Sequence, residues 1–274
     1  MNNAPEPQLS LQQVADELGV HYMTAYRYVR LGMLPAEREG RSWVVQRSDL
    51  DAFQSPSTVR PERGSTRWDS RLISRLLAAD DSGAWSVIEA AMASGLTPSD
   101  VYQSMLVPAL REVGERWEAG DIDVAQEHAA SQIAGRLIAR LGPMMMSRGV
   151  RRGTVIVGST ATELHDLPLT IISDLLRAER LEVINLGANL PPEFFAAAVA
   201  RGDDVVAAAI GVTMPDQGAE IARTVNAIRA VSDVDILVGG SGVSDDIADL
   251  PGVTAIATTS DEAIAVIEAV LAGR

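Results

Sequence analysis

The chain of 274 residues contains only three histidines, and two of them have a glutamate close by in the sequence. Glu163 stands two residues before His165, in a polar stretch, GSTATELHD, that follows the apolar run TVIV. Glu127 directly precedes His128. An imidazole can ligate a metal centre through one ring nitrogen while a carboxylate holds the other nitrogen. Two plainer interpretations stay open, because His165 could cap the following helix and Glu127-His128 could be a solvated pair.

Other kinds of site chemistry find no support in the sequence. The chain has no cysteine, which excludes disulfides, thiolate zinc sites and thiol nucleophiles. It contains neither a P-loop nor a Gly-x-Gly-x-x-Gly motif, and the run GGSG alone is weak evidence for a phosphate site. We therefore expect a protein that is not an enzyme.

The part of the chain around His165, residues 151–274, predicts a flavodoxin-like α/β domain. Five strand-like runs, separated by helical runs, predict a five-stranded parallel sheet: TVIVGST, LEVINLG, VVAAAIGVT, DILVGGSG and VTAIATT. Ligands bind such sheets beyond the carboxyl ends of the strands, where the loops lie. Thr213 follows the third strand and Gly239-Gly240 end the fourth, so we expect both at the same edge as His165.

The segment before this domain, residues 68–147, predicts a four-helix bundle. Trp117 ends the third helix and Glu127-His128 begin the fourth. Helices joined by a short loop bring these positions to one end of a bundle, so an indole and an ionisable pair should converge there. Taken alone, a tryptophan at a helix end is more often a packing residue.

Residues 9–54 predict a winged helix-turn-helix domain, followed by a polar linker at residues 55–67. Ser10 and Gln13 form a capping-box pattern that opens a short helix. A second helix is predicted from about Tyr22 to Leu31, and Arg38–Arg41 predict a hairpin turn before the strand SWVVQ.

A local excess of arginine in this domain favours nucleic acid as the partner. The whole chain has a net charge of −14, but residues 20–48 hold five arginines against two glutamates. The second helix of such a domain enters the major groove of double-stranded DNA. We expect bases and phosphates to be contacted by six side chains: Thr24, Arg27, Tyr28, Arg30, Arg38 and Arg41. The alternative is that these side chains form a solvated helix face.

The sequence gives no sign of a membrane segment. No apolar run approaches the ~20 residues of a membrane-spanning helix. The first ten residues, MNNAPEPQLS, are polar and do not resemble a signal peptide. We expect a cytoplasmic protein without membrane contact.

Several of these motifs resemble those of known families. The stretch DELGVHYMTAYRYVRLGMLPAEREGRSWVVQRSDLDAF resembles the excisionase-like branch of the MerR-type DNA-binding domains. The α/β domain resembles cobalamin-binding domains, whose signature is Asp/Glu-x-His-x-x-Gly, then Ser-x-Leu or Ser-x-Thr, then Gly-Gly. Its counterparts in this chain are Glu163 to Pro168, Gly211-Val212-Thr213 and Gly239-Gly240. Trp117 with Glu127-His128 is similar to the Trp-x9-Glu-His spacing of adenosylcobalamin-dependent, light-responsive MerR-type repressors.

The resemblance implies cobalamin as the cofactor, in its adenosyl form. It assigns the cofactor-binding residues by position: Trp117, Glu127, His128, Glu163, His165, Asp166, Thr213, Gly239 and Gly240. His165 would be the lower axial ligand of cobalt, and Trp117, Glu127 and His128 would line the upper face. Gly239-Gly240 would let the backbone approach the nucleotide tail.

Three positions depart from the pattern of these families. Pro168 stands where the signature has glycine, which stiffens the loop, although proline is tolerated in the first turn of a helix. Gly211 replaces the serine that contacts the buried base, a loss of about 1 kcal/mol of hydrogen bonding. Glu118 follows Trp117, where light-sensing relatives can place a histidine.

These observations lead us to expect a cobalamin-responsive transcriptional regulator, a repressor, with light as one candidate signal. A head with a net charge of +3 binds DNA weakly by itself, so a homo-oligomer is expected. Two alternatives stay open. One is a regulator whose degenerate sensory domain binds no cobalamin or another ligand, and the other is a corrinoid protein of methyl transfer.

Overall fold

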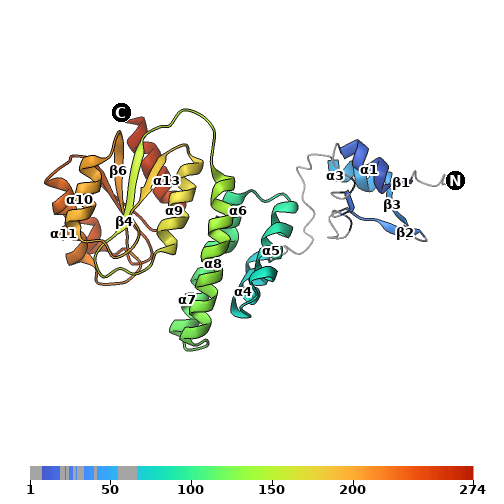
Figure 1. Ribbon diagram of the computed structural model, residues 1–274, viewed down its shortest axis with the longest axis horizontal. Coiled ribbons are helices and arrows are strands. Elements are labelled where there is room, and N and C mark those ends of the chain that lie inside the picture. The colour runs from blue at the N-terminus through green and yellow to red at the C-terminus, as the bar shows by residue number, and fades with distance from the viewer. Residues whose placement is uncertain are drawn as a thin grey trace. The chain divides into compact units, whose positions relative to one another are not determined.

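A computed structural model describes most of the chain (Figure 1). The described residues are 8–18, 22, 25, 26, 29, 34–39, 42–54 and 67–273. They form two compact units, one within residues 1–68 and 86–96 and the other within residues 69–85 and 97–274. Each unit is described by itself.

Within the described residues up to Gln54, the first unit contains a small antiparallel sheet and helices. The elements are β1 (Gln8–Ser10), α1 (Leu11–Leu18), β2 (Glu37–Glu39), β3 (Ser42–Gln46) and α3 (Arg47–Gln54). The strand order is β1-β3-β2, so β3 pairs on both sides. The capping box is confirmed, because the Gln13 side chain accepts from Ser10 N–H at 2.9 Å. Strand β1 was not expected from the sequence.

The predicted second helix of this unit is described at four positions. Tyr22, Ala25, Tyr26 and Val29 are helical, and Ala25 and Val29 are buried in the core of the unit. The core residues are Leu11, Val14, Ala15, Ala25, Val29, Leu34, Val45 and Leu50. Ala25 and Val29 are four positions apart, so they lie on one face of the helix, and that face is buried.

The six predicted DNA contacts are only partly within the described residues. Arg38 is exposed and lies inside β2, opposite Trp43, so the prediction that the hairpin turn begins at residue 38 is wrong. Strand pairing continues through Glu39 and Ser42, which leaves only two residues to connect β2 and β3. The other five lie outside the described residues: Thr24, Arg27, Tyr28, Arg30 and Arg41.

The helical region, residues 68–145, consists of four helical stretches. They are α4 (Trp68–Leu77), α5 (Asp81–Ala93), a third stretch made of α6 (Pro98–Val101), η1 (Tyr102–Leu106) and α7 (Val107–Glu118), and α8 (Val124–Met145). Thr97 caps the third stretch through a capping box with Asp100, as its Thr-Pro start predicts. The segment η1 is a π-helix, in which Val107 N–H bonds to Tyr102 O. It precedes Pro108, whose nitrogen has no hydrogen to donate.

The α/β domain has the five-stranded parallel sheet that the sequence predicts. Strands and helices alternate as β4 (Thr154–Ser159), α9 (Leu167–Ala178), β5 (Glu182–Asn185), α10 (Pro192–Arg201), β6 (Val205–Gly211), α11 (Gly218–Arg229), β7 (Asp235–Gly239), α12 (Asp245–Ala248), β8 (Ala255–Ala257) and α13 (Ser260–Ala272). Every strand pair is parallel, and the order β5-β4-β6-β7-β8 is the flavodoxin-like order.

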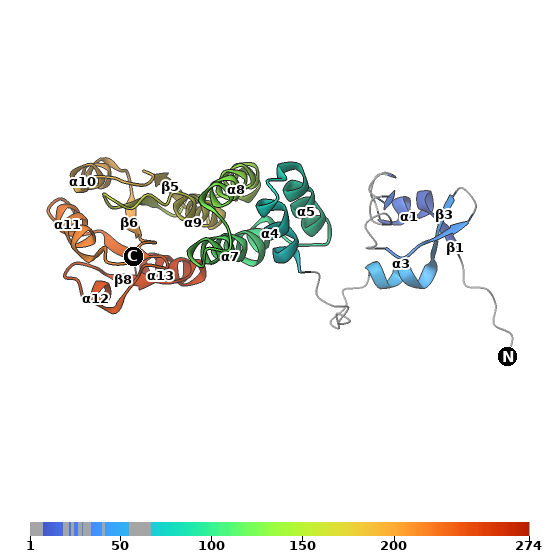
Figure 2. The ribbon, with the colours of Figure 1, turned by 90° about the horizontal axis from the view of Figure 1, so that it is seen from below.

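Helices cover both faces of this sheet (Figure 2). One core contains Ile156 of β4 with side chains of α10 and α11, and the other contains Val155 and Val157 with side chains of α9 and α13. Alternate residues of β4 therefore point into opposite cores. Such two-sided burial explains why the strands read as continuous apolar runs.

Within the second unit, the third helical stretch and α8 pack against the α/β domain. Helix α8 lies along α9 (Figure 1), and the Tyr102 hydroxyl donates to Asp174 Oδ2 of α9 at 2.7 Å. The Gln103 amide donates to Asp261 of α13 at 2.6 Å.

None of the helices within the described residues combines the length and the apolar character that a membrane span needs.

Candidate functional site

The candidate site lies where the strand order of the sheet reverses. Strands β4 and β6 are neighbours, and the helices that follow them, α9 and α11, cover opposite faces. Their loops therefore leave the sheet toward opposite faces, and the region beyond the carboxyl ends of these two strands is the usual ligand position in such sheets. Residues 160–166 form the first loop and residues 212–217 the second.

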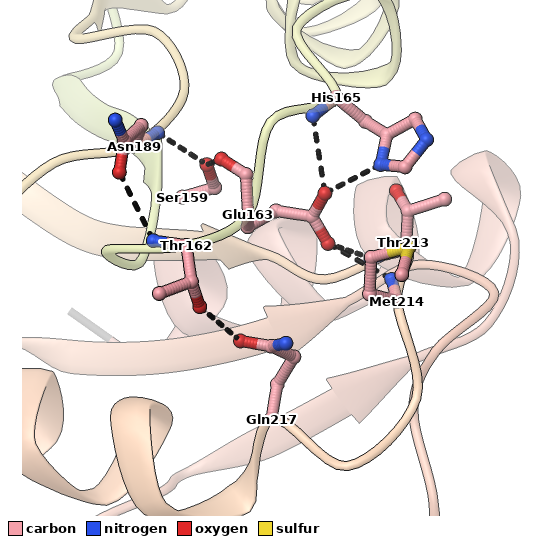
Figure 3. Close-up of polar contacts among 8 residues, drawn as sticks. All are labelled: Ser159, Thr162, Glu163, His165, Asn189, Thr213, Met214 and Gln217. Atoms are coloured by element: carbon pink, nitrogen blue, oxygen red, sulfur yellow. Dashed lines mark hydrogen bonds and ion pairs between the residues drawn. The ribbon is translucent and has the colours of Figure 1, made fainter.

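A buried carboxylate, that of Glu163, joins these two loops (Figure 3). Its Oε2 accepts Thr213 N–H at 2.7 Å and Met214 N–H at 2.9 Å. Its Oε1 accepts the backbone N–H of His165 at 3.1 Å and lies 2.5 Å from Nδ1 of the same histidine. Both oxygens are therefore satisfied without water, and the glutamate fixes the histidine relative to the second loop.

These hydrogen bonds determine the charge of Glu163. Burial raises the pKa of the carboxyl, but donation from Met214, Thr213 and His165 outweighs it and lowers the pKa below 4.5. The carboxylate is then only an acceptor, so Nδ1 of His165 must carry a proton. In a neutral ring this leaves Nε2 with a free lone pair.

The geometry around His165 suits a transition-metal ligand. Its side chain is 47% exposed, whereas that of Glu163 is 1% exposed. An imidazole that donates one N–H to a buried carboxylate has a fixed orientation and a more basic second nitrogen. The expected pairing of Glu163 with His165 is thus present, together with the predicted position of Thr213 in the adjoining loop.

Packing within the domain leaves no room for a side chain at Gly240, the first residue after β7. Gly240 has φ of +129°, and a Cβ there would overlap the carbonyl oxygen of Val212. Gly242 N–H donates to the same oxygen at 3.1 Å. Gly239 has more room, since a Cβ would lie 3.2 Å from Ala257 O. The close approach of this loop to the Val212–Met214 backbone supports the amides that hold Glu163.

The structure accommodates both departures from the cobalamin-binding signature. Pro168 lies in the first turn of α9, and Asp166 occupies the N-cap position without a side-chain capping bond. At Gly211, a Cβ would overlap Cδ2 of Leu169, which is buried. Leu169 thus occupies the space that a serine side chain would need.

The residues expected at the upper face lie at one end of the helical region. Trp117 is 47% exposed near the end of α7, and Glu127 and His128 lie in the first turns of α8. Glu127 bonds to His128 Nδ1 at 2.6 Å and accepts from Ser131 at 2.6 Å. None of the hydrogen bonds found for these described residues joins the indole to the pair.

Three parts of the chain match known protein families. Residues 9–56 match a helix-turn-helix domain, and residues 68–141 and 153–268 each match a B12 binding domain family. The chain is a helix-turn-helix protein with two B12-binding domains. The match at 68–141 covers the helical region, and the match at 153–268 covers the α/β domain that contains Glu163 and His165.

Relatives of this helix-turn-helix and B12-binding protein fall into two groups. It is 25% identical to a trimethylamine corrinoid protein of Methanosarcina barkeri over 197 residues, which are 70% of this chain and 91% of the relative. It is 32% identical to the HTH-type transcriptional repressor CarH of Myxococcus xanthus over 133 residues. That alignment covers 48% of this chain and 43% of the repressor.

A solved structure supports the fold of the B12-binding part. The monomethylamine corrinoid protein of Methanosarcina barkeri superposes with a TM-score of 0.65 at 20% sequence identity, covering 74% of this chain and 97% of that chain. The B12-binding protein described here therefore shares the fold of a corrinoid protein.

Cobalamin fits the residues present at the sheet edge. Nε2 of His165 is free to bind cobalt, and its ring is held in place through Glu163. Two apolar side chains on the adjoining loops, Leu164 and Met214, are 72% and 45% exposed. Such exposure leaves apolar surface for a large flat ligand to cover.

Sequence reasoning placed Thr213 at this edge of the sheet but missed its backbone role, and it missed Met214 altogether. The N–H groups of Thr213 and Met214 hold Glu163, but a backbone donor leaves no residue type as a signal. Asn189 and Gln217, which contact the loop of Glu163, were also missed. They stand in loops after other strands, and only the predicted sheet edge could have pointed to them.

Proposed function

We propose that the protein is a cobalamin-dependent, DNA-binding transcriptional regulator. The observation that carries this proposal is the Glu163–His165 pair beyond the carboxyl ends of β4 and β6, in a chain that also has a helix-turn-helix domain. In this proposal His165 Nε2 would ligate cobalt and Glu163 would hold the His165 ring. Asp166, Thr213 and Gly239-Gly240 would adjoin the corrinoid.

The helix-turn-helix domain would bind double-stranded DNA and repress transcription. Support comes from the family match at residues 9–56 and from the similarity to the CarH repressor. Arginine at 27, 30, 38 and 41 would supply the phosphate and base contacts. A head with this small net charge needs a second copy for tight binding, so the proposal includes a homo-oligomer.

The helical region would sense the upper face of the cofactor. Trp117 presents an exposed indole, and Glu127-His128 present polar groups at the same end of the region. We propose that these three residues hold an adenosyl group. When bound, adenosylcobalamin would supply a cobalt–carbon bond that light can break.

The regulatory step is then a change in the interactions made by the chain. Trp117, Glu127 and His128 would hold the helical region in one arrangement while the adenosyl group is present. A ligand shifts a conformational equilibrium only by its differential affinity for the two states. Without an adenosyl group to contact, Trp117, Glu127 and His128 would no longer favour that arrangement or the DNA-binding assembly.

A second candidate is a corrinoid protein of methyl transfer, which the alignment to the trimethylamine corrinoid protein favours. That alignment reaches 91% of the relative yet leaves about a third of this chain outside it. The helix-turn-helix match lies at the N-terminus and distinguishes the two candidates. A regulator whose α/β domain binds no cobalamin is a further alternative, since Leu169 occupies space beside Gly211.

DNA binding tests the regulatory part of the proposal. Gel-shift assays on DNA upstream of the protein's own gene should show a complex with adenosylcobalamin in the dark that illumination weakens. Arg27→Ala or Arg30→Ala should weaken the complex and reduce the slope of log affinity against log salt by about 0.9 for each phosphate that the variant no longer neutralises. Arg201→Ala, an exposed charge on α10, is the matched control. Parent protein that binds this DNA equally with and without cobalamin would contradict the proposal.

A further inference from the structure

The loop after β5 holds the segment that carries Glu163 (Figure 3). The side-chain oxygen of Asn189 accepts Thr162 N–H at 3.0 Å, and Asn189 N–H donates to the carbonyl oxygen of Glu163 at 2.8 Å. Asn189 thus hydrogen-bonds both the N–H of Thr162 and the carbonyl oxygen of Glu163. The Ser159 hydroxyl adds a bond of 3.3 Å to the same carbonyl.

Thr162 is held in a conformation that its side chain disfavours. Its φ of +79° lies in the left-handed region, which costs a β-branched residue about 1–3 kcal/mol. Such a residue keeps this conformation only when its surroundings impose it. The Asn189 side chain accepts the N–H of Thr162, and the Thr162 hydroxyl donates to Gln217 Oε1 at 3.1 Å. The loops after β5 and β6 therefore both restrain Thr162.

The backbone at Thr162 sets the direction of the next side chain. The Glu163 carboxylate must reach Thr213 N–H, Met214 N–H and His165 at once, at 2.5 to 3.1 Å. A hydrogen bond no longer exists when its donor and acceptor separate to about 3.6 Å. A small rotation of the Thr162–Glu163 segment would therefore break the bond to His165.

We propose that Asn189 is a positioning residue for the histidine ligand. Its side-chain oxygen fixes Glu163 so that the carboxylate keeps the His165 proton on Nδ1 and leaves Nε2 free. The role of Nε2 toward cobalt rests on the proposed function, whereas the position of the proton can be measured without a cofactor.

Three variants isolate the Asn189 side chain. Asn189→Gly keeps the left-handed backbone, where φ is +56°, and keeps the backbone N–H, but removes the acceptor for Thr162. Asn189→Asp keeps the acceptor oxygen and should behave as the parent. Asn185→Gly is the matched control, because Asn185 lies in the same part of the chain but accepts from Gly187 N–H at 2.9 Å.

The first measurement uses the full chain without cofactor. Nitrogen-15 NMR of labelled histidine reports which ring nitrogen of His165 carries the proton, and His165→Gln assigns its signals. The parent, Asn189→Asp and Asn185→Gly should show the proton on Nδ1, and Asn189→Gly a mixture of both forms. Thermal unfolding checks each fold, and Asn189→Ser, which is too short to reach Thr162, replaces the glycine variant if that one unfolds.

The second measurement titrates the same proteins with cobinamide, a cobalt corrinoid without a nucleotide base of its own. A nitrogen ligand seen in the visible spectrum must then come from the protein. Asn189→Gly should bind about 10-fold more weakly and lose the nitrogen-ligated spectrum, a loss typical of removing a partner that orients a metal ligand. If the parent binds neither cobinamide nor adenosylcobalamin, the proposed function fails while the NMR still decides the inference. A folded Asn189→Gly variant in which His165 keeps its proton on Nδ1 would overturn the inference that Asn189 positions the histidine.

Discussion

The phenol of Tyr102 in the helical region lies 2.7 Å from the carboxylate of Asp174 on α9, and both side chains are buried. Arg177 bonds the second carboxylate oxygen at 2.9 Å. Burial and the hydrogen bond to Asp174 raise the pKa of Tyr102 far above its ordinary value, so the phenol stays a donor. The same carboxylate faces Gly142 of α8, where a Cβ would lie 2.6 Å from Asp174 Oδ2.

Gly142→Ala should lower the free energy of unfolding by about 1–3 kcal/mol, the usual cost of overpacking a filled interface. Gly135→Ala on the same helix should not, because its Cβ would lie 3.5 Å from Leu167, an ordinary contact. Alanine is favoured over glycine in a helix by up to about 1 kcal/mol. Urea unfolding of both variants checks this pair.

Pro143 follows Gly142 and independently disfavours a larger residue there. Repeating both substitutions in an Asp174→Ala background separates the two effects. The part of the cost that comes from the carboxylate should vanish in that background. An undiminished cost would assign it to the proline alone.

Glu163→Gln should lower the free energy of unfolding by about 1–3 kcal/mol near neutral pH, since a charged acceptor of three backbone N–H groups is lost. The pH dependence has a definite sign. The folded chain lowers the pKa of Glu163 below 4.5, so this stability is present above pH 4.5 and is lost as pH falls through the folded value. The parent and variant curves should therefore converge below pH 4.5 in denaturant titrations, and parallel curves would refute the buried carboxylate.

Gly211→Ser should destabilise the α/β domain, although it restores the residue of the cobalamin-binding signature. Its Cβ would overlap Leu169, and overpacking costs about 1–3 kcal/mol. The double change Gly211→Ser with Leu169→Ala should lose less stability than the sum of the losses of the two single changes, because removing the leucine side chain opens the same space. Thermal unfolding of both single variants and of the double variant measures this, and additive losses would show that Leu169 is not the obstacle.

Trp117→Ala should bind hydroxocobalamin as the parent does but should reduce the preference for adenosylcobalamin over methylcobalamin. An aromatic contact of about 0.5–1.5 kcal/mol corresponds to a change of roughly 2- to 12-fold in relative affinity. Trp117→Phe, which keeps an aromatic ring, should retain most of it. Titrations in the dark measure both ratios, and an unchanged ratio in the alanine variant would leave the exposed indole without a role in the site.

The sequence predicted the elements more completely than the contacts between them. Five apolar runs were enough for the parallel sheet, because strands buried on both faces lack polar alternation. The Glu163–His165 contact followed from two residues on one loop. Strand β1 was missed, since three residues carry too little pattern.

The contacts that the sequence did not predict depend on packing between residues far apart in the chain. The Tyr102–Asp174 bond joins residues 72 positions apart, and nothing in either local sequence indicates the other. The overlap that a side chain at position 211 would make with Leu169 likewise depends on how β6 packs against α9, which the local sequence does not reveal. Asn189 reads as an ordinary loop residue until its left-handed φ and its bond to Thr162 are known.

The most direct test is the visible absorption spectrum of the full chain titrated with adenosylcobalamin in the dark, for the parent and for His165→Ala. We predict that the parent binds with the spectrum of a protein nitrogen on cobalt, and that His165→Ala loses this spectrum and most of its affinity while keeping its unfolding temperature. Glu163→Gln should lie between them, with affinity reduced by about 10- to 100-fold. A parent that binds no cobalamin, or a His165→Ala variant with the parent's spectrum and affinity, would contradict the assignment of His165 as the cobalt ligand.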